Sequence, residues 1–118
     1  MMVIGLSGGF DTTWHLDYDL PYDFFHDASA VLLEDGKMVA AVEQERLNRI
    51  KHTNRSPTPA IRACLEAHGA TIKDVDCFAY CATEANADQI LYAYHTRKGV
   101  RNKRMGIRAQ LQQSLEEE

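Results

Sequence analysis

The sequence lacks long hydrophobic runs and an excess of positive charge, and both absences narrow the class of protein. Its 118 residues carry 13 Lys and Arg against 17 Asp and Glu, for a formal net charge of -4. This balance does not favour nucleic-acid binding, although basic residues gather at 46–55 and 97–108. No apolar stretch approaches the roughly 20 residues of a membrane helix, and MMVIGL is too short for a signal peptide. We therefore expect a cytoplasmic protein with no membrane association.

Cysteine is also scarce. The chain contains Cys64, Cys77 and Cys81, an odd number that does not make a disulfide framework. The spacing of Cys77 and Cys81 lacks the second pair of ligands that a structural zinc site needs. We expect all three to be buried, reduced thiols, and we expect no metal site among them.

Short apolar runs predict four strands. Met2–Leu6 is a buried strand that ends in a tight turn. Ala28–Leu33 and Lys37–Glu43 form a hairpin, in which Gly36 supplies the positive φ of the turn. Cys77–Cys81 is the fourth strand.

Helical signals fall mainly after this hairpin. A short helix is expected within Glu43–Lys51, and a longer one begins with Thr58 as N-cap and Pro59 at the first helical position. Gly69 ends that helix in the left-handed conformation. Two further helices are expected at the C-terminal end of the sequence, over residues 85–95 and 101–118.

This order of elements predicts an α/β fold with a mixed sheet. The first three strands form an antiparallel meander, and a helical crossover returns the fourth strand parallel to its neighbour. Four short strands leave a sheet edge open, which is typical of an incomplete domain. One interpretation is therefore a non-catalytic module that pairs with a separately encoded remainder, or with itself as a homo-oligomer.

The hairpin carries polar residues at both ends, in an ordered series. The series comprises His26-Asp27, Ala28-Ser29-Ala30, Asp35-Gly36, Glu43-Gln44-Glu45-Arg46 and Lys51-His52. It resembles the N-terminal part of the carbamoyltransferase family that includes nodulation and antibiotic O-carbamoyltransferases. The resemblance covers roughly residues 2–82.

The resemblance implies part of an actin-like ATPase (ribonuclease H-like) module. In such proteins a YrdC-like domain makes carbamoyl-adenylate from carbamoyl phosphate and ATP, and the N-terminal module passes the carbamoyl group to a small-molecule hydroxyl acceptor. The family's metal-binding H-x3-H motif and the YrdC-like domain are both missing from residues 1–118. We therefore expect an incomplete N-terminal portion that holds no cofactor by itself. ATP, carbamoyl phosphate, a divalent metal and the rest of the carbamoyltransferase would be needed for activity.

The resemblance also makes His26 the candidate general base, because imidazole titrates near neutral pH. The alternative is a loop histidine bonded to a backbone carbonyl. Asp27 is expected to face the other side of the strand, so that it contacts substrate or the loop backbone and does not orient His26.

Arg46, Lys51 and His52 are predicted to bind substrate through phosphate or adenylate groups, which suit guanidinium and ammonium ions. The alternative is a solvated helix face. For Arg46, a structural ion pair with Glu43 or Glu45 is the favoured interpretation.

Two further segments are candidate binding elements. Ser7-Gly8-Gly9 follows a strand, as phosphate-binding turns do, and is predicted to approach the cofactor, with a simple tight turn as the alternative. Asp23 lies in the acidic, aromatic loop over residues 10–25, whose composition suits a polyhydroxylated acceptor. A solvated loop is the other interpretation of that segment.

Overall fold

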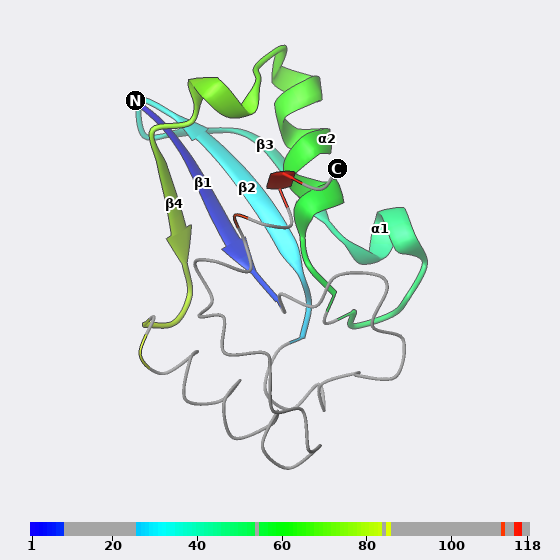
Figure 1. Ribbon diagram of the computed structural model, residues 1–118. Helices are drawn as coiled ribbons and strands as arrows, with labels where there is room; N and C mark the ends of the chain where they lie inside the picture. Colours follow the sequence, from blue (N-terminus) through cyan, green and yellow to red (C-terminus); the bar gives the residue numbers. More distant parts are fainter. Residues whose placement is uncertain (9–25, 54, 84, 86–111, 113–114, 117–118) are drawn as a thin grey trace. The chain divides into compact units, whose positions relative to one another are not determined.

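The computed structural model describes residues 1–8, 26–53, 55–83, 85, 112 and 115–116. The chain divides into two compact units, Met1–Cys81 and Ala82–Glu118. All elements from the first strand to the last lie in the first unit (Figure 1). The two helices predicted over residues 85–95 and 101–118 lie almost wholly outside the described residues.

The first unit is built on a four-stranded mixed sheet. Its strands are β1 (Met2–Ser7), β2 (Ser29–Glu34), β3 (Lys37–Glu43) and β4 (Cys77–Tyr80), in the order β3-β2-β1-β4. β1 and β3 pair antiparallel with β2, and β4 pairs parallel with β1. The predicted meander and the parallel return are both confirmed, as is the small α/β class (Figure 1).

Helices cover one face of this sheet (Figure 1). α1 (Glu45–Asn48) is a single turn after β3, and α2 (Thr58–His68) leads through the 3-10 helix η1 (Ile72–Asp74) to β4. Gly69 has φ 70° and ends α2 in the left-handed conformation, as predicted. α2 contacts both β2 and β3, so the crossover from β3 to β4 passes over the sheet.

The core lies between α2 and alternate residues of the central strands. Ile4 and Leu32 are completely buried, and so are Ile61 and Cys64 from α2. The strict alternation of buried and partly exposed residues in β1 follows from the two-residue period of a strand that has one covered face. Burial of these side chains is the main force that holds α2 on the sheet.

The start of α2 differs from the prediction. The N-cap is Pro57, not Thr58, and the Thr58 hydroxyl hydrogen-bonds to Ser56 Oγ at 2.8 Å. Gln44, at the end of the hairpin, provides the missing cap: its Oε1 accepts a hydrogen bond from the Ala60 amide at 3.0 Å. Gln44 is only 3% exposed, so a side chain distant in sequence satisfies a buried donor of the first turn.

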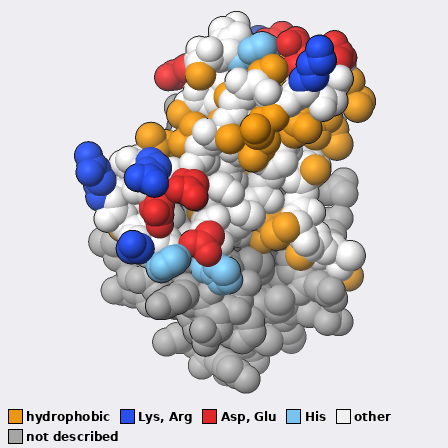
Figure 2. All heavy atoms as spheres, turned by 180° about the vertical axis from the view of Figure 1, so that it is seen from behind, with side chains coloured by type: hydrophobic (Ala, Val, Ile, Leu, Met, Phe, Trp, Pro, Cys, Tyr) orange, Lys and Arg blue, Asp and Glu red, His pale blue; other side chains and the backbone are white. Residues whose placement is uncertain are grey.

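The opposite face of the sheet is apolar and uncovered within the described residues. The register sets Val3 beside Leu33 and Cys77, and Met38 on β3 is 69% exposed. Hydrophobic side chains form a band on the face shown in Figure 2. The prediction of buried thiols is correct for Cys64 and wrong for Cys77 and Cys81, which are exposed. Cys77 lies in β4, an edge strand of the described sheet, and Cys81 directly follows that strand. None of the described helices is both long and apolar enough to cross a membrane.

Candidate functional site

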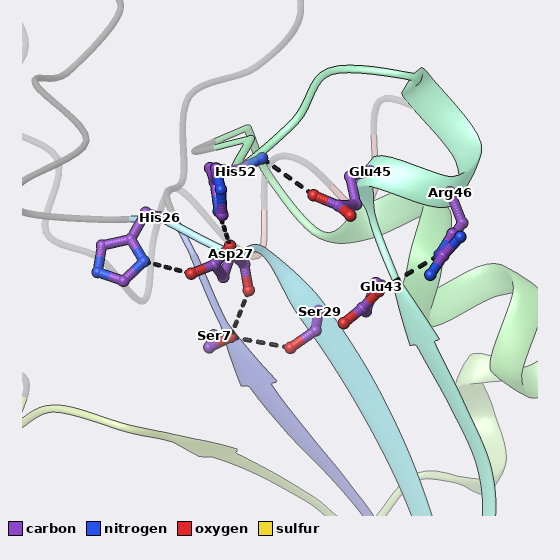
Figure 3. A network of polar contacts seen from close by, with 8 residues as sticks. All are labelled: Ser7, His26, Asp27, Ser29, Glu43, Glu45, Arg46 and His52. Carbon is purple, nitrogen blue, oxygen red and sulfur yellow. Dashed lines mark hydrogen bonds and ion pairs between the residues drawn. The ribbon is translucent and has the colours of Figure 1, made fainter.

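The polar site lies where three strands meet at one end of the sheet. The antiparallel register sets Ser7, the last residue of β1, opposite Ser29, the first of β2, and sets Ser29 opposite Glu43, the last of β3. The segments that precede β2 and follow β3 therefore converge at this end. Figure 3 shows the residues that they contribute.

The centre of the site is a carboxylate between two imidazoles. His26 Nδ1 lies 2.6 Å from Asp27 Oδ2, and His52 Nδ1 lies 2.7 Å from Asp27 Oδ1 (Figure 3). The expectation that Asp27 does not orient His26 is therefore wrong. Asp27 precedes β2 and has φ 51°, so the alternation of a strand does not apply to it.

Asp27 is also held through its backbone. Ser7 Oγ donates a hydrogen bond to the Asp27 carbonyl at 3.0 Å and lies 2.9 Å from Ser29 Oγ. These contacts stabilise the left-handed conformation at Asp27, which is uncommon for a residue other than glycine. Ser7, predicted to bind a cofactor, thus anchors the backbone of Asp27; cofactor binding by Ser7 stays a prediction.

The loop that carries His52 is fixed by a separate set of contacts. Glu45 Oε2 accepts a hydrogen bond from the His52 amide at 3.0 Å, and His52 has φ 52°. Asn48 Nδ2 donates to Thr53 Oγ1 at 3.0 Å, and the Thr53 carbonyl accepts from the Ala28 amide at 3.0 Å. The last bond ties the loop directly to the segment that holds Asp27.

Glu45 and Ser29 are among the site residues that the functional predictions omitted. Both lie inside the ordered series described above, so their positions carried a signal. Spacing alone does not indicate which acid of the pair Glu43 and Glu45 reaches the His52 loop. The structure assigns that contact to Glu45.

The electrostatics follow from this arrangement. Hydrogen bonds from His52 and then from His26 lower the pKa of the Asp27 carboxyl below its ordinary value of 3.8. The side chains of His26, Asp27 and His52 are each about half exposed, at 53%, 54% and 53%. The Asp27 carboxyl is therefore ionised at neutral pH, and the three side chains remain accessible to a small molecule.

The predicted cationic residues lie at the periphery. Arg46 Nε is 3.4 Å from Glu43 Oε2, which confirms the structural ion pair. Both side chains are strongly exposed, so the pair contributes little to stability. Lys51 is exposed in the turn before His52, and its predicted role in substrate binding stays a prediction. Asp23 lies outside the described residues.

The turn after β1 packs tightly against the site. Gly8 has φ 106°, and a Cβ atom there would lie 2.4 Å from the Ala28 Cβ and 2.5 Å from its Cα. The Tyr80 hydroxyl donates to the Gly8 carbonyl at 2.8 Å, and burial raises the pKa of that hydroxyl. Close packing accounts for glycine at position 8; a role in cofactor binding is untested, and Gly9 lies outside the described residues.

Among the described residues, one group of side chains is placed so that it could bind a divalent cation. One ligand atom each from Asp27, Glu45 and His52 lies within 4.8 Å of the others. The set suits Mn²⁺, Fe²⁺ or Zn²⁺ in chemical type. However, the His52 imidazole is already bonded to Asp27, and the His52 amide to Glu45, so the group is complete by hydrogen bonding alone. While these bonds are in place, the Asp27 and His52 atoms are engaged with each other and are not available to a resident metal.

Known proteins resemble the chain over most of its length. A family model described as the carbamoyltransferase N-terminus matches residues 20–115. The nodulation protein NolNO of Sinorhizobium fredii is 50% identical over 91 residues, which are 77% of this chain and 13% of that protein. An uncharacterized 19.2 kDa protein of Rhizobium etli, from the syrM 5′ region, is 44% identical over 91 residues, or 77% of this chain and 53% of that protein.

A third relative matches a shorter part of the chain. An uncharacterized protein of Synechocystis is 45% identical over 53 residues, which are 45% of this chain and 9% of that protein. The chain thus spans about half of one of these relatives and a much smaller part of the other two.

Proposed function

Since the chain belongs to the carbamoyltransferase N-terminus family, we propose that it is the N-terminal portion of an O-carbamoyltransferase, with His26 as general base. The observation that carries the proposal is the pair of imidazoles bonded to one carboxylate at one end of the sheet. The topology β3-β2-β1-β4 also agrees with the proposal that the unit is part of an actin-like, ribonuclease H-like module.

The proposed reaction needs a base beside a hydroxyl group. His26 Nε2 takes the proton of the acceptor hydroxyl while the acceptor oxygen bonds to the carbonyl carbon of carbamoyl-adenylate. The bond from that carbon to the phosphate oxygen breaks, and its electron pair leaves with AMP. The products are a carbamate ester, AMP and a protonated His26, which returns its proton to water.

Cations near the phosphate would stabilise the charge that develops on AMP. Lys51 is the exposed candidate for this role, because Arg46 is already paired with Glu43. ATP, carbamoyl phosphate and a divalent metal belong in this proposal to the remainder of the enzyme. The chain alone is proposed to be inactive.

A chimeric enzyme tests the proposal. The N-terminal region of a family carbamoyltransferase with a known acceptor is replaced by this chain, and transfer of a labelled carbamoyl group is measured. We expect His26→Gln to lower kcat by about 10²–10⁴-fold, the usual contribution of a general base. His68→Gln is the matched control, because His68 Nε2 bonds Glu34 at the opposite end of β2. Equal rates for the two variants would refute the assignment of His26.

The uncovered apolar face of the sheet favours a second candidate function, a non-catalytic assembly module that pairs with a separately encoded remainder or with itself. Met38 and Val39 are exposed on β3, which is an edge strand of the sheet formed by the described residues. Light scattering measures the mass of the 118-residue chain alone and after addition of the separately expressed remainder of a family member. A monomer that forms no complex with that remainder would exclude this function.

A further inference from the structure

Asp27 is the one described side chain that contacts both imidazoles of the site. Its two oxygens are each used once, by His26 at 2.6 Å and by His52 at 2.7 Å. Strand alternation led to the expectation that Asp27 contacts substrate or the loop backbone and does not orient His26. The geometry supports a different role.

The chemistry of the two bonds fixes the position of the protons. An ionised carboxylate has lone pairs and no proton, so it can only accept hydrogen bonds. Asp27 is ionised at neutral pH, because both bonds lower its pKa. Each bonded nitrogen must therefore be the donor, and both are Nδ1. In the neutral His26 ring the lone pair then lies on Nε2.

We propose that Asp27 is a positioning residue, whose carboxylate holds the proton of His26 on Nδ1 and so makes Nε2 the basic nitrogen. This inference rests on the proposed function, because His26 acts as a base only in that reaction. The carboxylate also stabilises the imidazolium that forms when Nε2 accepts the hydroxyl proton, since an opposite charge lies 2.6 Å away.

His52 completes the arrangement from the other side. Its Nδ1–H occupies the second oxygen of Asp27 and limits rotation of the carboxylate. Glu45 holds the His52 amide, and Ser7 holds the Asp27 carbonyl. Asp27 is thus fixed through both its side chain and its backbone, as it must be to orient the ring of another residue.

The charged groups around Asp27 agree with this assignment. Besides the two imidazoles, the nearby elements contribute Glu45 from α1 and Lys51 from the turn before His52. Arg46 is paired with Glu43, and the described structure records no ion pair between an arginine or lysine and Asp27. Within the described residues, the Asp27 carboxylate therefore interacts with the two imidazole rings and with no arginine or lysine.

Nitrogen NMR of the 118-residue chain tests the inference without any need for activity. The two ring nitrogens of a neutral histidine have different ¹⁵N shifts according to which one is protonated, so long-range ¹H–¹⁵N spectra identify the tautomer. His26 is assigned by its loss in His26→Gln. We expect the Nδ1–H form at His26 in the native chain.

The chain provides an internal reference in the same spectrum. His68 contacts the Glu34 carboxylate through Nε2 at 3.0 Å, so it should show the opposite tautomer, Nε2–H. In Asp27→Ala, the Nδ1–H form of His26 should cease to dominate while His68 is unchanged. Asp35→Asn is the matched control. Asp35 is an exposed carboxylate in the turn between β2 and β3, at the other end of the sheet, and it bonds the terminal amine. It should leave both rings as they are.

Two outcomes would overturn the inference: an Nε2–H tautomer at His26 in the native chain, or an unchanged Nδ1–H tautomer in Asp27→Ala. In the chimeric enzyme, Asp27→Ala should lower kcat about 10²-fold with little change in KM, and should alter the pH profile of kcat. A merely structural role would leave that profile unchanged and would also overturn the inference. A chimera that transfers no carbamoyl group refutes the proposed function, whereas the NMR result still decides the role of Asp27 on the tautomer.

Discussion

Replacement of Gly8 by alanine should destabilise the domain strongly. The backbone at Gly8 has φ 106°, which an alanine adopts at a cost of about 1–3 kcal/mol. The new Cβ would also lie 2.4 Å from the Ala28 Cβ and 2.5 Å from the Ala28 Cα. Overpacking of this kind costs about 1–3 kcal/mol after the neighbours shift. The sum is a loss of about 2–6 kcal/mol in the free energy of unfolding.

Gly36→Ala separates the two contributions. Gly36 also has a positive φ, of 79°, but nothing lies within 4 Å of the Cβ position. Its replacement should therefore cost only the backbone term, about 1–2 kcal/mol. The loss in Gly8→Ala should exceed the loss in Gly36→Ala, mainly through the steric term.

Urea unfolding of the 118-residue chain, followed by circular dichroism, measures both losses if the slope m stays constant. Small domains have only about 5–15 kcal/mol of stability, so Gly8→Ala is expected to be largely unfolded at modest urea concentration. Addition of Ala28→Gly should restore only part of the loss, because the Ala28 Cα at 2.5 Å remains. Equal midpoints for Gly8→Ala and Gly36→Ala would refute the steric argument.

Three further predictions address the core, the cap and the acidic groups. Ile4→Ala removes a fully buried side chain and should lower the free energy of unfolding by about 2–5 kcal/mol. Met38→Ala, at a position that is 69% exposed, should change it by less than about 0.5 kcal/mol. Similar losses for the two variants in urea unfolding would contradict the assigned core. Gln44→Ala leaves a buried amide of α2 without its acceptor and should cost about 1–3 kcal/mol, and an unchanged urea midpoint would be inconsistent with the cap. The folded-state pKa values of Asp27 and Asp74 are lowered, so their stabilising contribution is present above the unfolded value of 3.8 and is lost as the pH falls through the folded values. The Tm should therefore fall as the pH is lowered below 3.8, and less steeply in Asp74→Asn. An identical slope would disprove the contribution of Asp74.

Local rules predicted the elements whose causes are local. The strand at β1, the turn at Gly36 and the end of α2 at Gly69 each depend on a few neighbouring residues, and the structure confirms them. The parallel placement of β4 followed from the helical crossover through α2. Periodicity and glycine positions were sufficient for this part of the fold.

The site was less predictable because its contacts are not local. Asp27 meets His52 across 25 residues, and both adopt left-handed conformations that no strand pattern indicates. The contact between His26 and Asp27 was excluded by an alternation that begins only at Ser29. The cap on α2 comes from Gln44, so inspection of the residues next to the helix could not find it.

The dual attachment of Gln44 has a consequence for the order in which the chain folds. Its backbone amide bonds the Ala28 carbonyl at 2.8 Å, and its side chain accepts from the first turn of α2. The hairpin must therefore close before the Ala60 amide in that turn finds its acceptor, which makes early formation of the isolated helix unfavourable. In native-state hydrogen exchange, the amides of Gln44 and Ala60 should open together, as members of one cooperative unit.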